Sequence, residues 1–284
     1  MGRCSRMNTP FKKAADMKPI ARSLLFVPGD RPERFEKAAA SGAHQLILDL
    51  EDAVAPAAKA VARDAIASWL RAGHRAIVRI NSVETPWHGD DLSMLEVFPQ
   101  AGVMLPKAEA VVMAQVTARL PGREAIGLVE SVAGYAQLQA LAAVDGLSRL
   151  AFGSVDFSLE TGIADEGDAL TAVRTGIVMA SVLAGLEPPI DGVSVEFTDA
   201  DLISQHALRS LCLGFGGKLC IHPRQIPSVN AAFRPSKAEE EWARRVMDVF
   251  SRSGGAAVAL DGKMIDRPVV ERARRIVANL AAAG

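Results

Sequence analysis

Short apolar runs alternate with longer segments of helical periodicity from Arg22 onward. Each run has four to six residues, which suits a buried strand, and the segments between them repeat apolar positions every three or four residues. This alternation is typical of βα units, in which helices join neighbouring parallel strands. The predicted strands are Ser23–Val27, Gln45–Leu50, Ala76–Ile80, Gly102–Leu105, Ala125–Val129, Leu147–Phe152, Gly192–Val195 and Lys218–Ile221.

Eight βα repeats favour a closed barrel. An open Rossmann-type sheet usually carries a glycine-rich fingerprint after its first strand, and this sequence has none there. We therefore predict a TIM (β/α)8 barrel over residues 22–235. Its first helix begins near Pro32, and the further predicted helices are Ala57–Leu70, Glu109–Leu120, Val132–Ala142, Ala169–Ala184 and Asp201–Leu213.

The two ends of the chain differ from this repeat. After Pro235 comes a charged amphipathic segment, Ser236–Ser251, then a glycine pair and a last helix from Arg267. Residues 236–284 are therefore predicted to form a C-terminal helical appendage, which either braces the barrel or acts as a lid. Residues 1–21 are predicted to be a polar N-terminal extension.

Composition and charge exclude several classes of protein. The 284 residues carry 32 Lys and Arg against 33 Asp and Glu, interleaved along the chain, so a nucleic-acid-binding module is excluded. No run approaches the roughly 18 apolar residues of a membrane span, and the basic start lacks the apolar region of a secretory signal. Cys4, Cys212 and Cys220 show neither metal nor disulfide spacing, so we expect a cytoplasmic protein.

Polar residues follow six of the predicted strands, at the end where barrel enzymes place their active sites. Glu130 and Asp156 close neighbouring strands and supply the oxygen ligands that Mg²⁺ prefers, so we predict a metal site there. The alternative is that Glu130 caps the following helix and Asp156 is a loop carboxylate. Asp49, Glu51 and Asp52 are predicted to hold metal-bound water, with surface or capping roles as the alternative.

Three cations near the same edge have more than one possible role. Arg79 ends an apolar strand, where a guanidinium needs an anionic partner such as a substrate carboxylate or enolate, or a structural ion pair with Asp49 or Glu51. Lys107 could form a Schiff base, but beside a metal site a structural or electrostatic role is favoured. His222 could bind metal or carry a proton, and a hydrogen-bonded structural role is favoured.

The same strand ends carry a set of motifs that resembles one known family. The motifs are Arg22–Gly29, Leu48–Ala53, Val78–Asn81, Leu105–Lys107, Gly127–Ser131, Phe152–Phe157 and Cys220–Pro223. Together, and in this order over residues 22–284, they resemble the citrate lyase β-subunit-like branch of the HpcH/HpaI aldolase superfamily. The resemblance implies a TIM barrel that binds Mg²⁺ and cleaves or forms a carbon–carbon bond next to a thioester.

By this resemblance, Glu130 and Asp156 match the metal carboxylates and Arg79 the arginine that contacts substrate. The segment Gly262–Asp266 is similar to the tail motif of stand-alone members, whose aspartate enters a neighbouring subunit's site. Asp266 is then a candidate acid/base in a homo-oligomer, a trimer or hexamer. It could also cap the last helix, and the two roles are compatible.

The resemblance implies retro-Claisen cleavage of a 3-hydroxyacyl-CoA thioester. Mg²⁺, or Mn²⁺ in its place, would chelate a 2-oxoacid, Arg79 would stabilise the enolate, and Asp266 would exchange the proton. Coenzyme A phosphates are expected near Arg31 or Lys37. The tail motif favours a free lyase for malyl-CoA or citramalyl-CoA. The alternatives are an acyl-CoA thioesterase, an aldolase acting on free pyruvate and an aldehyde, and a citrate lyase β subunit within a complex.

Overall fold

The computed structural model describes residues 20–252 and 258–281. Residues 21–233 form one compact unit, and the described residues from 234 onward belong to a second. The predicted polar extension, residues 1–21, lies outside the described residues except for its last two positions. Each unit is considered by itself below.

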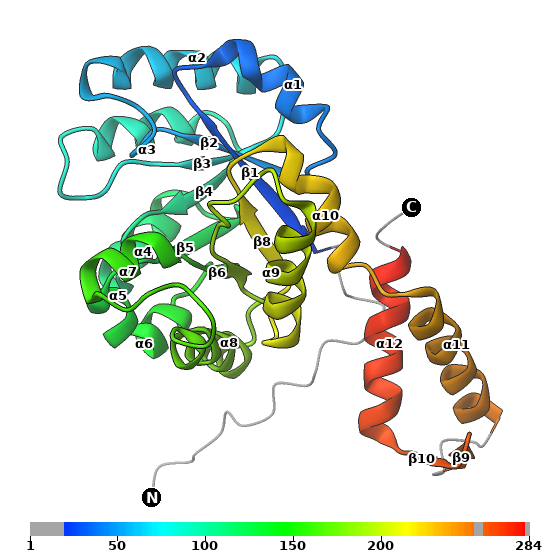
Figure 1. Ribbon diagram of the computed structural model, residues 1–284. Coiled ribbons are helices and arrows are strands. Elements are labelled where there is room, and N and C mark those ends of the chain that lie inside the picture. Colours follow the sequence, from blue (N-terminus) through cyan, green and yellow to red (C-terminus); the bar gives the residue numbers. More distant parts are fainter. Residues whose placement is uncertain (1–19, 253–257, 282–284) are drawn as a thin grey trace, which may run out of the picture. The chain divides into compact units, whose positions relative to one another are not determined.

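The first unit is a closed parallel β-barrel surrounded by helices (Figure 1). The strands pair in chain order and β8 returns to β1, which confirms the predicted TIM barrel. The strands are β1 Ser23–Pro28, β2 Gln45–Asp49, β3 Ile77–Arg79, β4 Gly102–Leu105, β5 Ala125–Val129, β6 Arg149–Phe152, β7 Ile190–Asp191 and β8 Gly217–Cys220.

The prediction for the seventh strand was wrong. Gly192–Val195 follows β7, which consists of Ile190 and Asp191. The acidic Asp191 interrupts the apolar pattern, and it is nevertheless buried because Arg174 forms an ion pair with it. A partner that is distant in the sequence therefore made a polar residue acceptable in the strand.

The helices follow the strands around the barrel. The predicted single helix Val132–Ala142 is two short helices that meet at Gln137. α3 and α7 were not predicted, because their apolar positions are too few to give a clear helical period. The helices are α1 Phe35–Ala39, α2 Lys59–Arg71, α3 His88–Glu96, α4 Ala110–Arg119, α5 Val132–Ala136, α6 Leu138–Ala142, α7 Ser154–Thr161, α8 Thr171–Ala184, α9 Ala200–Cys212 and α10 Ile226–Ala232, with the 3-10 turns Pro32–Arg34, Pro56–Ala58 and Pro223–Gln225.

Alternation along the strands divides the core of this unit in two. Alternate residues of a strand point to opposite faces of the sheet, so one set fills the barrel and the other packs under the helices. The larger cluster lies between the strands and helices and includes Leu25, Leu48 and Val78. The buried side chains of the inner cluster are Leu24, Ile47, Ile77, Met104, Ile126, Leu128, Ala151, Ile190 and Leu219.

The second unit consists of two helices joined by a two-stranded antiparallel sheet. It contains the C-terminal helices that the sequence predicted. It comprises α11 Lys237–Arg252, β9 Val258–Leu260, β10 Lys263–Ile265 and α12 Arg267–Ala281. Asp261 and Gly262 join the antiparallel strands with φ of 50° and 74°, the left-handed pair that a two-residue hairpin turn requires. Its own core contains Ala243, Val246, Ile265, Val270 and Ala273.

The described residues bear on two expectations from the sequence, the absence of a membrane span and the absence of disulfide bonds. Among the described helices, none is long and apolar enough to cross a membrane. Cys212 and Cys220 are unpaired, and burial raises the pKa of the Cys220 thiol to about 12, so this thiol is unreactive at neutral pH. Cys4 lies outside the described residues.

Candidate active site

Three of the predicted site residues share the inner face of the barrel at the carboxyl ends of its strands. Asp49, Arg79 and Glu130 are buried, with 1%, 9% and 3% of their surface exposed. Each lies two positions beyond an inward-facing apolar residue, and side chains two apart share a face. Those apolar residues are Ile47, Ile77 and Leu128. Strand alternation therefore brings these three polar groups into one layer above the apolar interior.

Asp49 and Arg79 form a bidentate ion pair between neighbouring strands. They are register partners of β2 and β3, and Arg79 Nε and Nη2 donate to Asp49 Oδ1 and Oδ2 at 2.7 and 2.6 Å. Asp49 also accepts the backbone N–H groups of Glu51 at 2.9 Å and Ala53 at 3.2 Å. Both oxygens of Asp49 are therefore engaged within the protein, which agrees with the structural ion pair that was the alternative for Arg79.

The rest of the Arg79 guanidinium faces further carboxylates. Arg79 Nη1 lies 3.0 Å from Glu51 Oε2 and 3.9 Å from Asp52 Oδ2, and the guanidinium carbon lies 4.8 Å from the centre of the Phe26 ring. Burial opposes the charge of Arg79, but its hydrogen bond and charge interaction with Asp49 outweigh burial and raise its pKa. Arg79 therefore stays cationic and has a fixed orientation.

Glu130 is held by two unusual backbone positions. Its Oε1 accepts the N–H of Lys107 at 2.8 Å, and Lys107 adopts a left-handed φ of 46°. Non-glycine residues with this φ are uncommon and concentrate at functional sites. At Gly153, a Cβ would lie only 2.4 Å from the Glu130 Cβ, so only glycine allows this approach. The glycine in the Phe152–Phe157 motif is therefore needed for steric reasons, because a larger residue would collide with Glu130.

Asp156 comes from a different element than the sequence suggested. It lies in the first turn of α7 and is half-buried, four residues beyond the end of β6. Its negative charge is nevertheless one of those that raise the pKa of Glu130. The two carboxylates therefore interact electrostatically, and their joint role as metal ligands stays a prediction.

The electrostatics of this layer fit a divalent cation. Burial, with the neighbouring Glu51, raises the pKa of Glu130 to about 8. Burial also raises the pKa of Glu51 to about 7, against the opposing charge of Arg79. A cation beside these groups would favour their ionised forms.

The ligand set fits magnesium better than zinc. Within the described ranges no group of three or more His, Cys, Asp or Glu side chains is arranged to enclose a metal ion. A zinc site usually needs three or four such ligands. Mg²⁺ keeps several waters and is commonly held by one or two carboxylates, so a pair such as Glu130 and Asp156 would suit it.

Two buried groups that shape the site were not found from the sequence. Lys59 Nζ donates to the carbonyls of Leu50 and Glu51, each at 2.7 Å, and thereby ties the acidic loop to α2. Asp91 Oδ2 accepts the backbone N–H and the side-chain amide of Asn81 at 2.9 and 2.7 Å. Both lie on the barrel-facing sides of helices, where an apolar period predicts an apolar residue. A charged residue at such a position was the feature of the sequence that could have identified Lys59 and Asp91.

Four other predicted positions lie at this end of the barrel unit. The side chain of Lys107 is exposed, and the contact of this residue with the site is the hydrogen bond from its backbone N–H to Glu130. His222 Nδ1 accepts the N–H of Arg224 at 3.1 Å and stacks on Phe197, which agrees with the structural role favoured for it. Arg31 and Lys37 are exposed in the segment that follows β1.

Asp266 belongs to the second unit and precedes α12. Its Oδ1 accepts the N–H of Val269 at 3.2 Å, and its side chain is exposed. Asp266 therefore caps α12, as the alternative role for it predicted, and Pro268 lies in the first turn of that helix. An exposed carboxylate that caps a helix is also free to contact another molecule.

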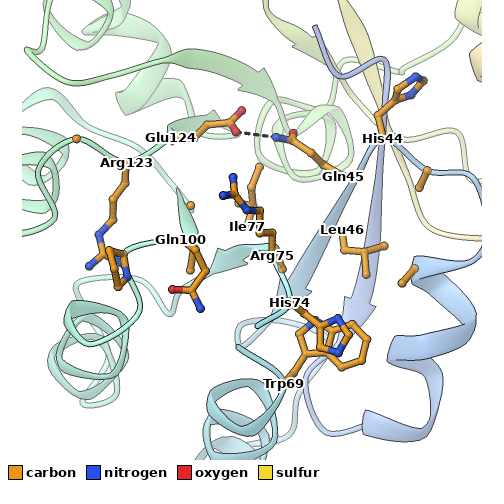
Figure 2. A pocket seen from close by; sticks show the side chains of 17 residues that line it. His44, Gln45, Leu46, Trp69, His74, Arg75, Ile77, Gln100, Arg123 and Glu124 are labelled. Atoms are coloured by element: carbon orange, nitrogen blue, oxygen red, sulfur yellow. Dashed lines mark hydrogen bonds between the residues drawn. The ribbon is translucent and has the colours of Figure 1, made fainter. Parts of the chain in front are cut away.

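A cavity shown from close by in Figure 2 lies among residues at the amino ends of β2, β3 and β4. It measures about 590 Å³, and its lining includes His44 and Gln45 at the amino end of β2 and Trp69 near the end of α2. Gln45 donates to Glu124 Oε2 at 2.6 Å across it (Figure 2). None of the predicted site residues lines this cavity. Barrel enzymes act at the carboxyl ends, so this cavity is not the candidate active site.

Comparison with known proteins is consistent with this geometry. The family model of HpcH/HpaI aldolase/citrate lyase matches residues 22–223. A citrate lyase subunit beta-like protein of Mycobacterium tuberculosis is 38% identical over 269 residues, covering 92% of this chain and 96% of that protein.

Two relatives in Cereibacter sphaeroides carry names that differ in the reaction they describe. A (3S)-malyl-CoA thioesterase is 32% identical, covering 92% of this chain and 95% of its own. An L-malyl-CoA/beta-methylmalyl-CoA lyase is 34% identical, covering 90% of this chain and 93% of its own. The crystal structure of protein CitE from M. tuberculosis with magnesium, acetoacetate and coenzyme A matches with a TM-score of 0.76 at 35% identity, covering 93% of this chain and 98% of that one.

Proposed function

Since the chain belongs to the HpcH/HpaI aldolase/citrate lyase family, we propose that it is a Mg²⁺-dependent lyase that cleaves or forms 3-hydroxyacyl-CoA thioesters. The observation that carries this proposal is the layer of buried carboxylates around Arg79 at the carboxyl end of the barrel. The similar CitE structure, crystallised with magnesium, acetoacetate and coenzyme A, supports the same ligand classes.

Glu130 and Asp156 are the residues that would hold Mg²⁺. When bound, the ion supplies Lewis-acid polarisation of the carbonyl of a 2-oxoacid. Glu130 keeps a fixed position because Lys107 donates to one of its oxygens and Gly153 leaves room for the other. Arg79, which Asp49 holds in place, provides a permanent positive charge for the oxygen of a thioester enolate.

The bond changes balance without an oxidant or another reactant. In cleavage, the bond breaks between the carbon next to the thioester carbonyl and the carbon that bears the hydroxyl group. Its electron pair goes into the thioester enolate, and the hydroxyl group loses its proton and becomes the carbonyl of a 2-oxoacid. The enolate then takes a proton to give acyl-CoA, and condensation follows the reverse order.

We assign the proton exchange at the acyl carbon to Asp266 from a second copy of the chain. Its exposed position at the start of α12 leaves the carboxylate accessible to another subunit. This assignment implies a homo-oligomer, a trimer or hexamer. Coenzyme A phosphates would meet Arg31 and Lys37, which are exposed after β1. Unpaired Cys212 and Cys220 suit the reducing cytoplasm.

Thioester hydrolysis is the second candidate, because a relative of 32% identity is named a malyl-CoA thioesterase. Water attacking the same bound ester would release free coenzyme A and a hydroxy acid. The two reactions therefore differ in their products, although they share substrate and metal.

A product assay tests the proposal. Purified protein with Mg²⁺ is given malyl-CoA and citramalyl-CoA, with EDTA as the control, and the 2-oxoacid and the free thiol are measured separately. We expect 2-oxoacid with acyl-CoA and no free thiol. Free thiol alone would favour the thioesterase, and turnover of pyruvate with an aldehyde in the absence of a thioester would favour the aldolase. No turnover of any thioester in either direction would overturn the lyase proposal.

Subunit mixing tests the role of Asp266. Asp266→Ala and Glu130→Ala chains are each expected to be inactive alone. If the site is shared between chains, mixed oligomers contain sites with both residues intact, so activity returns. Absence of recovery in mixtures shown to exchange subunits would leave Asp266 as a helix cap.

A further inference from the structure

A second polar cavity lies on the outer face of the barrel wall. It measures about 120 Å³ and is lined by residues of β7, β8, α8 and α9. Asp191 and Lys218 line it and alternate with the inward-facing Ile190 and Leu219, so they point away from the barrel interior. Its lining includes none of Asp49, Arg79 and Glu130.

Buried ion pairs build one wall of this cavity. Arg174, only 3% exposed, places Nε 2.9 Å from Asp191 Oδ1 and Nη2 2.8 Å from Asp165 Oδ1. Lys218 is also 3% exposed, and its Nζ donates to the Gly192 carbonyl at 2.6 Å. Burial opposes the charge of Asp191, but Lys218 and Arg174 outweigh burial and lower its pKa.

The cations of the cavity exceed its anions by one. Arg174, Arg209 and Lys218 face only Asp165 and Asp191, which leaves 3 − 2 = +1 among the charged lining residues. His206 adds no charge at neutral pH, because burial and then Lys218 and Arg209 lower its pKa.

Three N–H donors of this cluster are also unsatisfied. Arg209 Nε and Nη2 and Arg174 Nη1 are buried and have no hydrogen-bond partner within the described residues. A buried charged donor without a partner is costly, so such groups usually have a partner such as a bound ion or water. Two guanidinium groups with free donors match the geometry of a carboxylate or phosphate.

We propose that this cavity binds a small oxyanion, with the chemistry of a phosphate or a carboxylate. Its volume of about 120 Å³ is several times the roughly 30 Å³ that one water molecule occupies, so an ion of a few heavy atoms fits. The bound anion supplies the missing negative charge and accepts the free donors of Arg174 and Arg209. It thereby links α8 and α9 behind β7 and β8.

Equilibrium dialysis with labelled inorganic phosphate tests this site, without metal or coenzyme A. We expect wild-type protein to bind one phosphate per chain and Arg209→Ala to bind at least tenfold more weakly. Arg71→Ala removes an exposed arginine from α2 and serves as the charge-matched control, with binding unchanged. Competition by acetate distinguishes a carboxylate site from one that selects phosphate. Circular dichroism confirms folding, and Arg209→Gln replaces the alanine variant if that variant misfolds.

The experiment separates this cavity from the proposed coenzyme A site. The double variant Arg31→Ala and Lys37→Ala is expected to retain the bound phosphate, whatever its effect on a thioester reaction. The proposal is overturned if wild type binds no phosphate, if Arg209→Ala binds as tightly as wild type, or if the double variant loses the ion.

Discussion

The barrel wall carries two buried ion networks that differ in the sign of their excess charge. On the inner face, the carboxylates of Asp49, Glu51 and Glu130 surround one guanidinium, that of Arg79. On the outer face, the cations around Asp191 are in excess. Burial is the leading influence on Glu130 and on Asp191, yet the pKa rises in the first and falls in the second.

The difference shows how strand alternation separates functions on one sheet. Neighbouring positions along a strand point to opposite faces. The same barrel wall can therefore carry an acidic cluster that attracts cations on its inner face and a basic cluster that attracts anions on its outer face. The inner network lies at the end where barrel enzymes place their active sites, and a bound cation would favour the ionised forms of Glu51 and Glu130. The outer network connects strands to helices, and both of its carboxylates form ion pairs with Arg174.

The largest effect is expected when the negative charge of Glu130 is removed from the inner network. Glu130→Gln keeps an acceptor for the Lys107 N–H but lacks the negative charge, so we expect kcat to fall roughly 1,000-fold, about 4 kcal/mol of transition-state stabilisation. Steady-state kinetics with saturating Mg²⁺ measure the effect. Glu96→Gln, which changes an exposed carboxylate paired with Arg119, is the control and keeps full activity.

The matching test in the outer network should affect stability instead of catalysis. Arg174→Met leaves Asp191 and Asp165 without their main partner, so we expect a loss of about 3–5 kcal/mol in the free energy of unfolding. Urea denaturation measures it at a temperature where the variant is folded. The kcat of the folded variant should stay within about threefold of wild type. A large fall in kcat with unchanged stability would contradict the division between the two networks.

The raised pKa of Glu130 predicts how stability depends on pH. The folded protein keeps this proton up to about pH 8, whereas an unfolded glutamate loses it near its ordinary pKa of 4.5. Stability of the metal-free protein should therefore fall by roughly 2–4 kcal/mol as pH rises from 5 to 8. Denaturation curves across this range measure the slope. Glu130→Gln should reduce the slope to the part contributed by Glu51, whose pKa is also raised, to about 7, and Mg²⁺ should offset the slope. A flat wild-type curve would count against a buried Glu130 that lacks a cation.

A smaller effect is expected at the cation that holds the acidic loop. Lys59→Met removes the donor to the carbonyls of Leu50 and Glu51, so Glu51 loses its fixed position relative to Arg79. We expect kcat/KM to fall about tenfold to 100-fold, in the range of residues that orient a metal site indirectly. Lys237→Met, at the start of α11, is the control. An unchanged kcat/KM would show that Lys59 serves packing alone.

Much of the barrel and its inner network could be predicted because both follow from local periodicity. Alternating strand and helix patterns predicted the closed sheet, and the polar residues after six of the strands marked the end where barrel enzymes place their active sites. Arg79 stood out because a guanidinium at the end of an apolar strand needs an anion. The motifs at these strand ends also carried the family resemblance.

The remainder depended on contacts between segments that lie far apart in the sequence. The seventh strand was predicted at Gly192–Val195, and the ion pair with Arg174 allows the acidic Asp191 to be buried in the strand instead. Lys59 and the backbone N–H of Lys107 contribute through where the chain folds, and residue type alone does not reveal this. Asp156 was expected at a strand end and instead occupies the first turn of α7.

A count of bound Mn²⁺ tests most directly the claim that the inner network is a divalent-metal site. Electron paramagnetic resonance of free Mn²⁺ measures the number of ions bound per chain in the absence of substrate. We predict one ion per chain for wild type and for Asp165→Asn, which alters the outer network, and at least tenfold weaker binding for Glu130→Gln. Equal Mn²⁺ binding by wild type and Glu130→Gln would contradict the account.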